Sequence, residues 1–415
     1  MKSPSFRNIF RLFERTEIQT VHLKRSPDIL DGGLEFSAST AITALKEKHH
    51  PPSQLDTSSP LAIEEDCQEH IYDTVSVFLF LGITIGLMVV FPSLCLVSMV
   101  LLSLSATLPL ALLYAIWVLV VDSRSPELGG WGSICGLGRT MMNLPIWENY
   151  RNYFNASLIK TTDLPSDRNY VFAGHPHGVY CLGLFANILS NQTRFNALFP
   201  GIQVTSATLP VNFWLPGWRE FMLSLGFVSC ERNALKAVID GSTNRSVSAT
   251  SVAASESDGL MKRETGRALF IAVGGAEEFL LMEPGTMDLV ILKRKGFVKM
   301  AMTTGTSLVP VITFGENDYV NRIDTPFTRT LAKMTQRVAH FVFPVFEGRW
   351  GTAFPRRSRL TTVVGEPLHT ELIENPTDEE VTAFHAKYLA CLQGLYDQYK
   401  DVYFKHRKRE MAFVK

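Results

Sequence analysis

Two histidines separated by one proline are the residues of this chain best suited to chemistry. His175 and His177 lie in the stretch VFAGHPHGVYCLG, which begins as an apolar run and turns polar just before Gly178. In an extended segment, side chains two positions apart point to the same side. We therefore expect both imidazoles to face one cavity. The proline fixes the backbone between them, and the glycine lets a ligand or another backbone segment approach closely.

A neutral imidazole is the usual general base for a hydroxyl group near physiological pH. Two other interpretations stay open on the residues alone: an H-x-H metal site, which needs further ligands, and a structural pair of hydrogen-bonded histidines. The later histidines follow no metal-binding pattern; they are His340, His369, His385 and His406. The six cysteines include no CxxC pair, which argues against a zinc site and favours a reducing compartment.

A carboxylate could assist the histidines. The stretch ALFIAVGGAEEF indicates a strand that ends at Gly274 and Gly275 and is followed by Glu277 and Glu278. A carboxylate can hold a histidine in the useful tautomer and stabilise the imidazolium that forms. The alternative is a solvated loop charge, and we expect one of the two glutamates to be that.

A basic cluster surrounds Gly296 at the predicted start of a helix. Its members are Lys293, Arg294, Lys295 and Lys299. Helix N-termini and basic side chains bind phosphate groups, and coenzyme A carries several of them. A solvated charged face is the simpler alternative for such a run.

The elements that must position these residues alternate between strand-like and helix-like segments. This alternation predicts an α/β fold with a sheet flanked by helices. The predicted strands are YVFAG, GFVSC, ALFIAVGG, SLVPVITFG, HFVFPVF and LTTVVG, and helices are expected over 296–304 and 327–337. A capping box at Thr377 and Glu380 starts a final helix, whose apolar residues Val381, Phe384, Tyr388, Leu392, Leu395 and Tyr399 recur at helical spacing.

Composition divides the chain into three parts. Residues 1–70 are polar and predicted to be a largely disordered tail, and 123–415 form the predicted catalytic domain, with a flexible Ser/Thr-rich insert at 241–259. Between them, residues 74–121 contain no charged side chain or histidine. A membrane span needs about 20 apolar residues, so this run predicts a hairpin of two spans, interrupted at Pro92-Ser93 and Pro109. A buried helix pair is the alternative, although its outer faces would normally carry polar residues.

The overall balance excludes several function classes. Lysine plus arginine equal aspartate plus glutamate at 40 each, so no global basic field for nucleic acid exists. The chain contains neither a G-x-S-x-G elbow nor a phosphate-binding G-x-x-x-x-G-K-[ST] loop.

Taken in order, the motifs resemble those of the type 2 diacylglycerol acyltransferase family, which includes monoacylglycerol and wax-alcohol acyltransferases. They cover nearly all of 141–405, and the apolar run stands where that family has its membrane hairpin. Many members carry an aromatic residue where this chain has Gly174. We expect the smaller glycine to leave room for the acceptor. The motifs are NYF (152–154), RNYVF (168–172), HPHG (175–178), FPGI (199–202), Asn212-Phe213, Arg219-Glu220, GGA (274–276), RKGFVKMA (294–301), LVPVITFGEN (308–317), TTVVGEPL (361–368) and, more weakly, FLFL (78–81).

The resemblance implies a glycerolipid-acyltransferase-like mixed sheet behind a membrane hairpin, and transfer of an acyl group from acyl-CoA to diacylglycerol to form triacylglycerol. Acyl-CoA is a co-substrate, and no cofactor or metal is expected. We predict His177 as the base, His175 as its support and Glu278 as the partner carboxylate. The predicted substrate-binding residues are Gly178, Gly274, Gly275, Arg294, Lys295, Gly296, Phe297, Lys299, Phe78, Leu79 and Leu81.

Three alternatives stay open beside this prediction: a monoacylglycerol acceptor, a fatty-alcohol acceptor that would give a wax ester, and an inactive lipid-droplet scaffold. The implied location is the endoplasmic reticulum membrane, and the lipid-droplet surface as a second site. Both ends of the hairpin are predicted to be cytosolic, since two spans return the chain to its starting face. The sequons at Asn155, Asn191 and Asn244 should then carry no glycan. A homo-oligomer is compatible with the sequence, and no nucleic-acid partner is expected.

Overall fold

The structure is a computed structural model that describes residues 60–86, 93, 104–128, 137–241, 265–339, 342 and 345–414. The chain divides into two units, residues 1–62 and residues 63–415, and the described part of the second is compact. The second unit holds the sheet and all the candidate site residues. The predicted tail up to residue 59 and the predicted insert beyond Gly241 lie outside the described residues.

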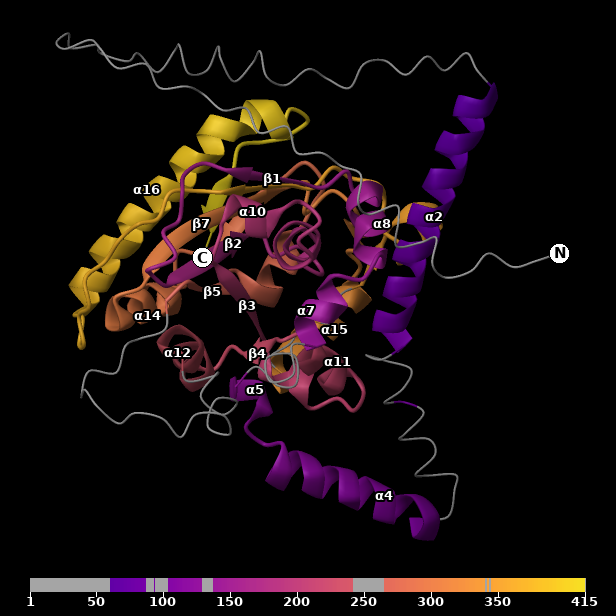
Figure 1. The fold of residues 1–415 in the computed structure, drawn as a ribbon, viewed down its shortest axis with the longest axis horizontal. Helices are drawn as coiled ribbons and strands as arrows, with labels where there is room; N and C mark the ends of the chain where they lie inside the picture. Colours follow the sequence, from indigo (N-terminus) through magenta and orange to yellow (C-terminus); the bar gives the residue numbers. More distant parts are fainter. Residues whose placement is uncertain are drawn as a thin grey trace, which may run out of the picture. The chain divides into compact units, whose positions relative to one another are not determined.

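A mixed sheet forms the centre of the second unit (Figure 1). Within the described residues it has seven strands in the order β1-β10-β7-β2-β5-β3-β4. Neighbouring strands are parallel except β10 and β7, which are antiparallel. This arrangement confirms the predicted α/β class with a mixed sheet. The strands are β1 Ser157–Lys160, β2 Tyr170–His175, β3 Gln203–Thr208, β4 Val228–Ser229, β5 Arg267–Ala272, β7 Ser307–Phe314 and β10 Thr361–Val364.

Alternate side chains of the central strand β2 enter two different cores. Val171 and Ala173 belong to one cluster, with residues from α12 (Arg232–Asp240), α14 (Gly296–Thr304) and α16 (Asp378–Tyr403). Tyr170 and Phe172 belong to the other, with residues from α8 (Ile146–Tyr153) and α11 (Trp218–Ser224). Helices therefore cover both faces of the sheet, as expected for a fully buried strand in a largely parallel sheet.

Shorter elements complete the unit. Two strand pairs lie outside the main sheet, β6 Asp288–Val290 with β11 Ala412–Val414, and β8 Asn321–Arg322 with β9 Phe346–Glu347. The short helical segments are α5 Ser125–Leu128, α7 Leu137–Met142, α9 Leu182–Leu184, η5 Phe185–Leu189, α10 Phe195–Leu198, η6 Pro210–Phe213, η8 Gly275–Leu281 and η9 Arg349–Gly351.

Local sequence signals predicted several elements well. The helix expected over 296–304 has those bounds, and the one expected over 327–337 lies within α15 (Pro326–Ala339). The capping box is present at the start of α16, where Thr377 accepts from the Glu380 amide and Glu380 accepts from the Thr377 amide. Of the strand predicted in HFVFPVF (340–346), the described residues include Val342, Val345 and Phe346, and of these three Phe346 lies in a strand, β9.

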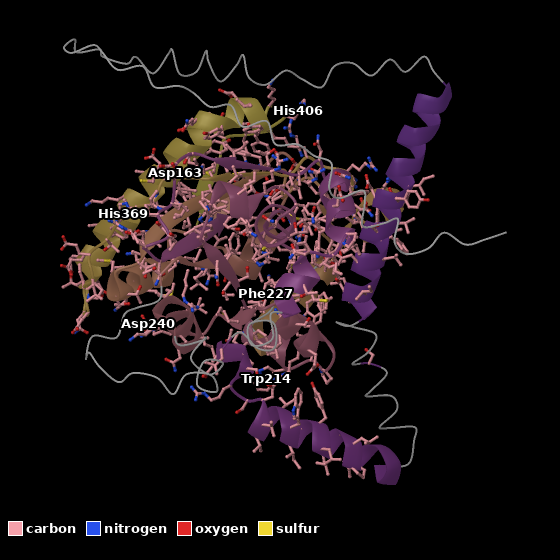
Figure 2. The ribbon with its side chains drawn as sticks, in the orientation of Figure 1. Asp163, Trp214, Phe227, Asp240, His369 and His406 are labelled. Atoms are coloured by element: carbon pink, nitrogen blue, oxygen red, sulfur yellow. The ribbon has the colours of Figure 1, made fainter. Side chains whose placement is uncertain are left out.

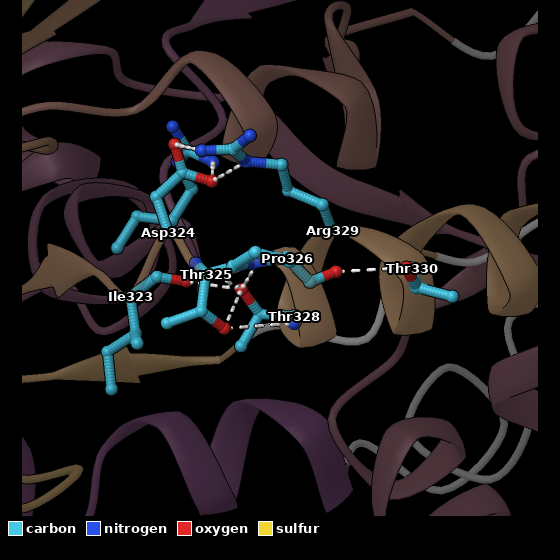
Figure 3. Close-up of polar contacts among 8 residues, drawn as sticks. Ile323, Asp324, Thr325, Pro326, Thr328, Arg329 and Thr330 are labelled. Atoms are coloured by element: carbon cyan, nitrogen blue, oxygen red, sulfur yellow. Dashed lines mark hydrogen bonds and ion pairs between the residues drawn. The ribbon is translucent and has the colours of Figure 1, made fainter.

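The start of α15 is fixed by a compact set of polar contacts (Figure 3). Thr325 precedes the helix and its hydroxyl accepts from the Thr328 amide, the usual arrangement of a helix N-cap. Arg329 reaches back to Asp324 at 2.7 Å, where a second cation, Arg322, also binds the carboxylate at 3.1 Å. These contacts fix the start of α15, a helix that also contacts the loop after β5.

The described parts of the apolar run of 74–121 lie in helices whose bounds differ from the prediction. Helix α2 spans Pro60–Ile85, and α4 (Leu104–Ile116) continues into the π-helical turn η4 (Trp117–Val121). The break predicted at Pro109 is wrong, since this proline lies inside α4, where its fixed φ is compatible with the helix and only one backbone donor is lost. The break predicted at Pro92-Ser93 is not covered, because Pro92 lies outside the described residues. None of the described helices is both long enough and apolar enough to cross a bilayer.

A buried ion pair joins the end of the apolar segment to α11. The Arg219 side chain is 1% exposed, and its guanidinium contacts the Asp122 carboxylate at 2.5 Å and donates to the Asp122 carbonyl at 2.9 Å. It also lies over the Trp117 ring, 5.5 Å from its centroid. Next to it, Glu220 accepts a hydrogen bond from the Tyr114 hydroxyl at 2.9 Å. We call these five residues the Arg219 clasp.

Candidate active site

Three loops that follow neighbouring parallel strands meet at one edge of the sheet. Strands β5, β2 and β7 are adjacent and parallel, so their carboxyl ends lie together. The loop after β2 carries His177, the loop after β5 carries Glu278, and the loop after β7 carries Glu316. The sheet topology therefore brings together the first two clusters that the sequence singled out, and it adds a third.

His175 is the last residue of β2 and lies in the core. Its side chain is 1% exposed, and its Nε2 is 3.0 Å from the Tyr388 hydroxyl on α16. That hydroxyl is also 3.4 Å from the carbonyl oxygen of Ala173, to which it can donate. Burial lowers the pKa of His175 to about 3, so this imidazole is neutral at physiological pH.

His177 lies beyond the end of the strand and is half-buried. Its Nδ1 is 3.0 Å from the carbonyl oxygen of Gly178. A carbonyl can only accept, so Nδ1 carries the proton and Nε2 is left with its lone pair. Burial lowers the pKa of His177, and the bond to Gly178 partly offsets that shift.

The expectation that both imidazoles share one cavity does not hold in its simple form. It assumed an extended backbone throughout, whereas β2 ends at His175 and a turn begins at Gly178. The two rings have different partners: Tyr388 for His175 and the Gly178 carbonyl for His177. The tautomer of His177 is thus set by a backbone carbonyl.

The Glu278 side chain contacts the backbone of the histidine loop. The carboxylate is 3% exposed; Oε2 accepts from the His177 amide at 2.6 Å and Oε1 accepts from the Val290 amide at 2.9 Å. Burial raises its pKa to about 7, while these two hydrogen bonds act to lower it. The predicted bond from Glu278 to an imidazole is not found: among the described residues the two carboxylate oxygens accept from the His177 and Val290 backbone amides instead.

Glycines make room for the carboxylates at this edge. A Cβ on Gly274 would lie 1.9 Å from Glu278 Cδ, and a Cβ on Gly178 would lie 2.8 Å from Glu316 Cγ. We expected a ligand to approach these two glycines closely. In the structure a glutamate side chain lies there instead. Gly275 has open space beside it and a φ of +61°, a conformation that glycine adopts without strain.

Glu277 links the loop after β5 to the basic cluster. It forms an ion pair with Arg294 at 3.4 Å, and both side chains are partly exposed. Its other oxygen accepts from Gln336 of α15 at 3.2 Å. Glu277 is thus the more solvated of the two glutamates, as expected of one of them.

The basic cluster surrounds the first turn of α14. Lys295 donates to the Thr382 hydroxyl at 2.8 Å, and Lys299 is exposed. Gly296, the first residue of the helix, has no atom within 4 Å of the place where a Cβ would lie. Phe297 is buried, with its ring centroid 5.1 Å from that of Tyr388. Phe297, on the first turn of α14, therefore packs against the residue that contacts His175.

The FLFL residues lie on α2. Leu81 is buried in the core, whereas Phe78 and Leu79 are 63% and 54% exposed. The Phe78 ring packs near Phe354, with centroids 5.9 Å apart.

Two further residues, Gly174 and Cys181, lie close to the histidine loop. A Cβ on Gly174 would lie 2.2 Å from the Phe270 ring, so the room that we expected for the acceptor at this position is filled by that ring. Cys181 donates its Sγ proton to the His177 carbonyl at 3.2 Å, and burial raises the pKa of its thiol well above the usual range. This cysteine is therefore no activated nucleophile.

Sequence reasoning missed three side chains at this edge: Glu316, Tyr319 and Tyr388. Glu316 had one available signal, because the GEN stretch follows the buried strand β7 just as GGAEE follows β5. The helical spacing of the last helix predicts only a core position for Tyr388. The residues that the structure describes contain no group of three histidine, cysteine or acidic side chains placed to hold a metal ion.

Comparison with known proteins defines the family. A model described as diacylglycerol acyltransferase matches residues 99–413. Diacylglycerol O-acyltransferase 2A of Umbelopsis ramanniana is 35% identical over 313 residues, which cover 73% of this chain and 81% of that protein. Diacylglycerol O-acyltransferase 2 of Xenopus tropicalis is 35% identical over 315 residues, 74% and 80% of the two chains. Human 2-acylglycerol O-acyltransferase 1 is 34% identical over 298 residues, 70% and 81%.

The solved structure of a 1-acyl-sn-glycerophosphate acyltransferase from Thermotoga maritima overlaps 79% of this chain and 96% of that chain. The TM-score is 0.34 at 13% identity, a likeness too low to support an argument. The sequence match decides the question: the chain belongs to the diacylglycerol acyltransferase family. It is therefore an enzyme of the O-acyltransferase class, and the resemblance read from the motifs is confirmed.

Proposed function

We propose that this chain transfers an acyl group from acyl-CoA to the free hydroxyl of diacylglycerol, with His177 as the general base. The observation that carries the proposal is the family match over residues 99–413. The matched region contains His177, which is half-buried, and no hydrogen bond among the described residues occupies its Nε2 lone pair. A general base needs that lone pair within reach of the proton it removes.

The proposed reaction has one transfer step. The diacylglycerol oxygen attacks the thioester carbonyl carbon while His177 Nε2 takes the hydroxyl proton. The new C–O ester bond forms, the C–S bond breaks, and the proton passes from the imidazolium to the departing thiolate. The products are triacylglycerol and free coenzyme A, and no acyl-enzyme is needed.

The other two predicted catalytic residues act as supports. Glu278 accepts from the His177 amide and so fixes the backbone from which the base projects. His175 stays neutral and packs the end of β2 against Tyr388.

The basic cluster serves acyl-CoA. Arg294 and Lys299 are exposed beside the N-terminus of α14, and the space in front of Gly296 is open. Free backbone amides of a first helical turn and nearby cations are suited to phosphate groups. Phe297 then connects this helix end to the core beneath His175.

The acceptor is delivered from a lipid phase. Large apolar side chains are exposed along α4 and η4; they include Leu110 at 69%, Leu113 at 63%, Leu119 at 73% and Val120 at 72%. Contiguous exposed apolar surface of this kind is typical of a membrane or partner contact. In the proposal, residues 74–121 form a membrane hairpin in the endoplasmic reticulum, with both ends cytosolic, and the same segment suits a lipid-droplet surface.

Monoacylglycerol is the second candidate acceptor, and one comparison favours it. Human 2-acylglycerol O-acyltransferase 1 matches this chain about as well as the relatives named for diacylglycerol. A monoacylglycerol acceptor would use the same base and the same acyl donor.

An acceptor panel tests the proposal. Membranes that contain the full chain receive labelled acyl-CoA with diacylglycerol, monoacylglycerol or a fatty alcohol. We expect labelled triacylglycerol from the wild type and from the control His406→Ala, whose histidine is exposed after the end of α16 (Figure 2). His177→Ala at equal abundance should give about a hundredth of that product or less. Activity above that level in His177→Ala, or product only from a fatty alcohol, would refute the assignment.

Membrane topology has a separate test. Protease added to sealed microsomes should reach tags at both termini, and no sequon should carry a glycan. A protected C-terminal tag would mean an odd number of spans and would contradict the hairpin.

A further inference from the structure

The loop after His177 is held by two side chains from the loop that follows β7. Glu316 accepts from the amides of Leu182 and Gly183 at 2.7 and 2.8 Å. The Tyr319 hydroxyl accepts from the amides of Val179 and Tyr180 at 3.0 and 3.2 Å. Four backbone donors between residues 179 and 183 are therefore satisfied by these two residues, and Tyr319 in turn donates to Glu316 at 3.3 Å.

Glu316 also packs against the residue that orients the base. The φ of Gly178 is +60°, and a Cβ there would lie 2.8 Å from Glu316 Cγ. The carbonyl of the same glycine accepts from His177 Nδ1. The path from Glu316 to the imidazole thus has one intermediate residue. Both side chains are deeply buried, Glu316 at 1% and Tyr319 at 0% exposure, so water cannot replace their bonds.

We propose that Glu316 and Tyr319 are positioning residues for His177. They hold the turn that begins at Gly178, so that its carbonyl keeps the proton on Nδ1 and leaves Nε2 as the basic atom. Neither touches the reacting atoms. This inference rests on the proposed function, because it needs His177 to be the base.

Isosteric substitutions separate this role from simple packing. Tyr319→Phe keeps the ring and removes the acceptor of two buried amides. Glu316→Gln keeps the shape but turns one acceptor oxygen into an amide NH2, which faces a backbone donor. The matched control is Tyr170→Phe, whose fully buried hydroxyl donates to the Pro165 carbonyl at 2.7 Å near the opposite end of β2.

The experiment compares full-length variants in membranes with the wild type and with His177→Ala. It measures kcat, the apparent KM for both substrates, the pH profile, and thermal stability after solubilisation. We expect Tyr319→Phe and Glu316→Gln to lower kcat about tenfold or more, since misplacement of a base costs rate rather than binding, with each KM within about twofold. Tyr170→Phe should keep kcat within about twofold of the wild type. Its loss of stability should be similar to that of Tyr319→Phe, because each substitution removes one buried hydroxyl.

The pH profile gives a readout that packing alone would not move. The bond to Gly178 raises the pKa of His177, so its loss should shift the acidic limb of kcat/KM to lower pH. If Tyr319→Phe changes neither kcat nor the acidic limb of kcat/KM while His177→Ala is inactive, the positioning role is overturned and the proposed function stays intact. An active His177→Ala would overturn both. If Glu316→Gln does not fold, Tyr319→Phe decides alone.

Discussion

Replacing Tyr388 by phenylalanine asks whether His175 takes part in proton transfer. The substitution removes the hydroxyl that lies 3.0 Å from His175 Nε2 and keeps the ring that packs on Phe297. With a pKa of about 3, protonation of His175 at pH 7 costs about 5 kcal/mol, compared with less than about 1 kcal/mol for an ordinary histidine. A base so hard to protonate contributes little, so we expect His175 to have a structural role.

The expected result is a loss of stability with little loss of rate. The orphaned, buried Nε2 should cost about 1–3 kcal/mol of the free energy of unfolding. Acyl transfer per folded molecule should stay within about threefold of the wild type, because His177 keeps its own bond to Gly178.

The assay combines thermal unfolding of the solubilised enzyme with initial rates at equal amounts of folded protein. Tyr170→Phe serves as the control for the loss of one buried tyrosine hydroxyl. A fall in kcat of about a hundredfold or more, with the fold intact, would refute the reasoning, since general-base catalysis contributes on that scale. It would mean that the His175–Tyr388 pair carries a proton.

Four other predictions concern this site and the Arg219 clasp. His177→Ala should lower kcat by about 10²–10⁴-fold at unchanged abundance, and a smaller loss measured in the labelled acyl-CoA assay would exclude it as the base. Arg294→Ala should raise the apparent KM for acyl-CoA about two- to tenfold, an effect that shrinks in a salt titration; a KM change for the acceptor instead would contradict it. The pKa of Glu278 is raised from 4.5 to about 7, so its contribution to stability is complete below pH 4.5 and is lost as pH rises through 7; thermal scans of Glu278→Gln should therefore show a flatter fall than the wild type over this window. Arg219→Met should lower the free energy of unfolding by about 3–5 kcal/mol, and Arg219→Met with Asp122→Asn should recover part of it; denaturation of the three chains decides this.

The elements predicted correctly were those that a short window of sequence specifies. The capping box and the apolar spacing of α16 are local signals, and so is the amphipathic pattern of α14. The meeting of the HPHG and GGAEE loops was also within reach, because both follow buried strands that a parallel sheet places side by side.

The partners of the histidines could not be predicted in this way. Tyr388 lies 213 positions from His175, and Glu316 lies 134 positions from the Leu182 amide that it binds. On α16, Tyr388 has the spacing of any core residue, and nothing in a single sequence distinguishes it from its apolar neighbours. The target of Glu278 was missed for a related reason: a backbone amide leaves no signature in the sequence, whereas a histidine side chain does.

The Arg219 clasp has a consequence for any attempt to obtain the catalytic part without its apolar segment. A chain shortened to start just after Asp122 would lack the Asp122 carboxylate and the Trp117 ring over the guanidinium, and would leave Arg219 with Glu220, at 3.4 Å, as its carboxylate partner among the described residues. Removing the shorter ion pair and the carbonyl acceptor of a guanidinium at 1% exposure strongly destabilises a protein core. The smallest fragment that folds should therefore begin before Tyr114 and keep part of the apolar helix, or else replace Arg219 with an apolar side chain of similar length.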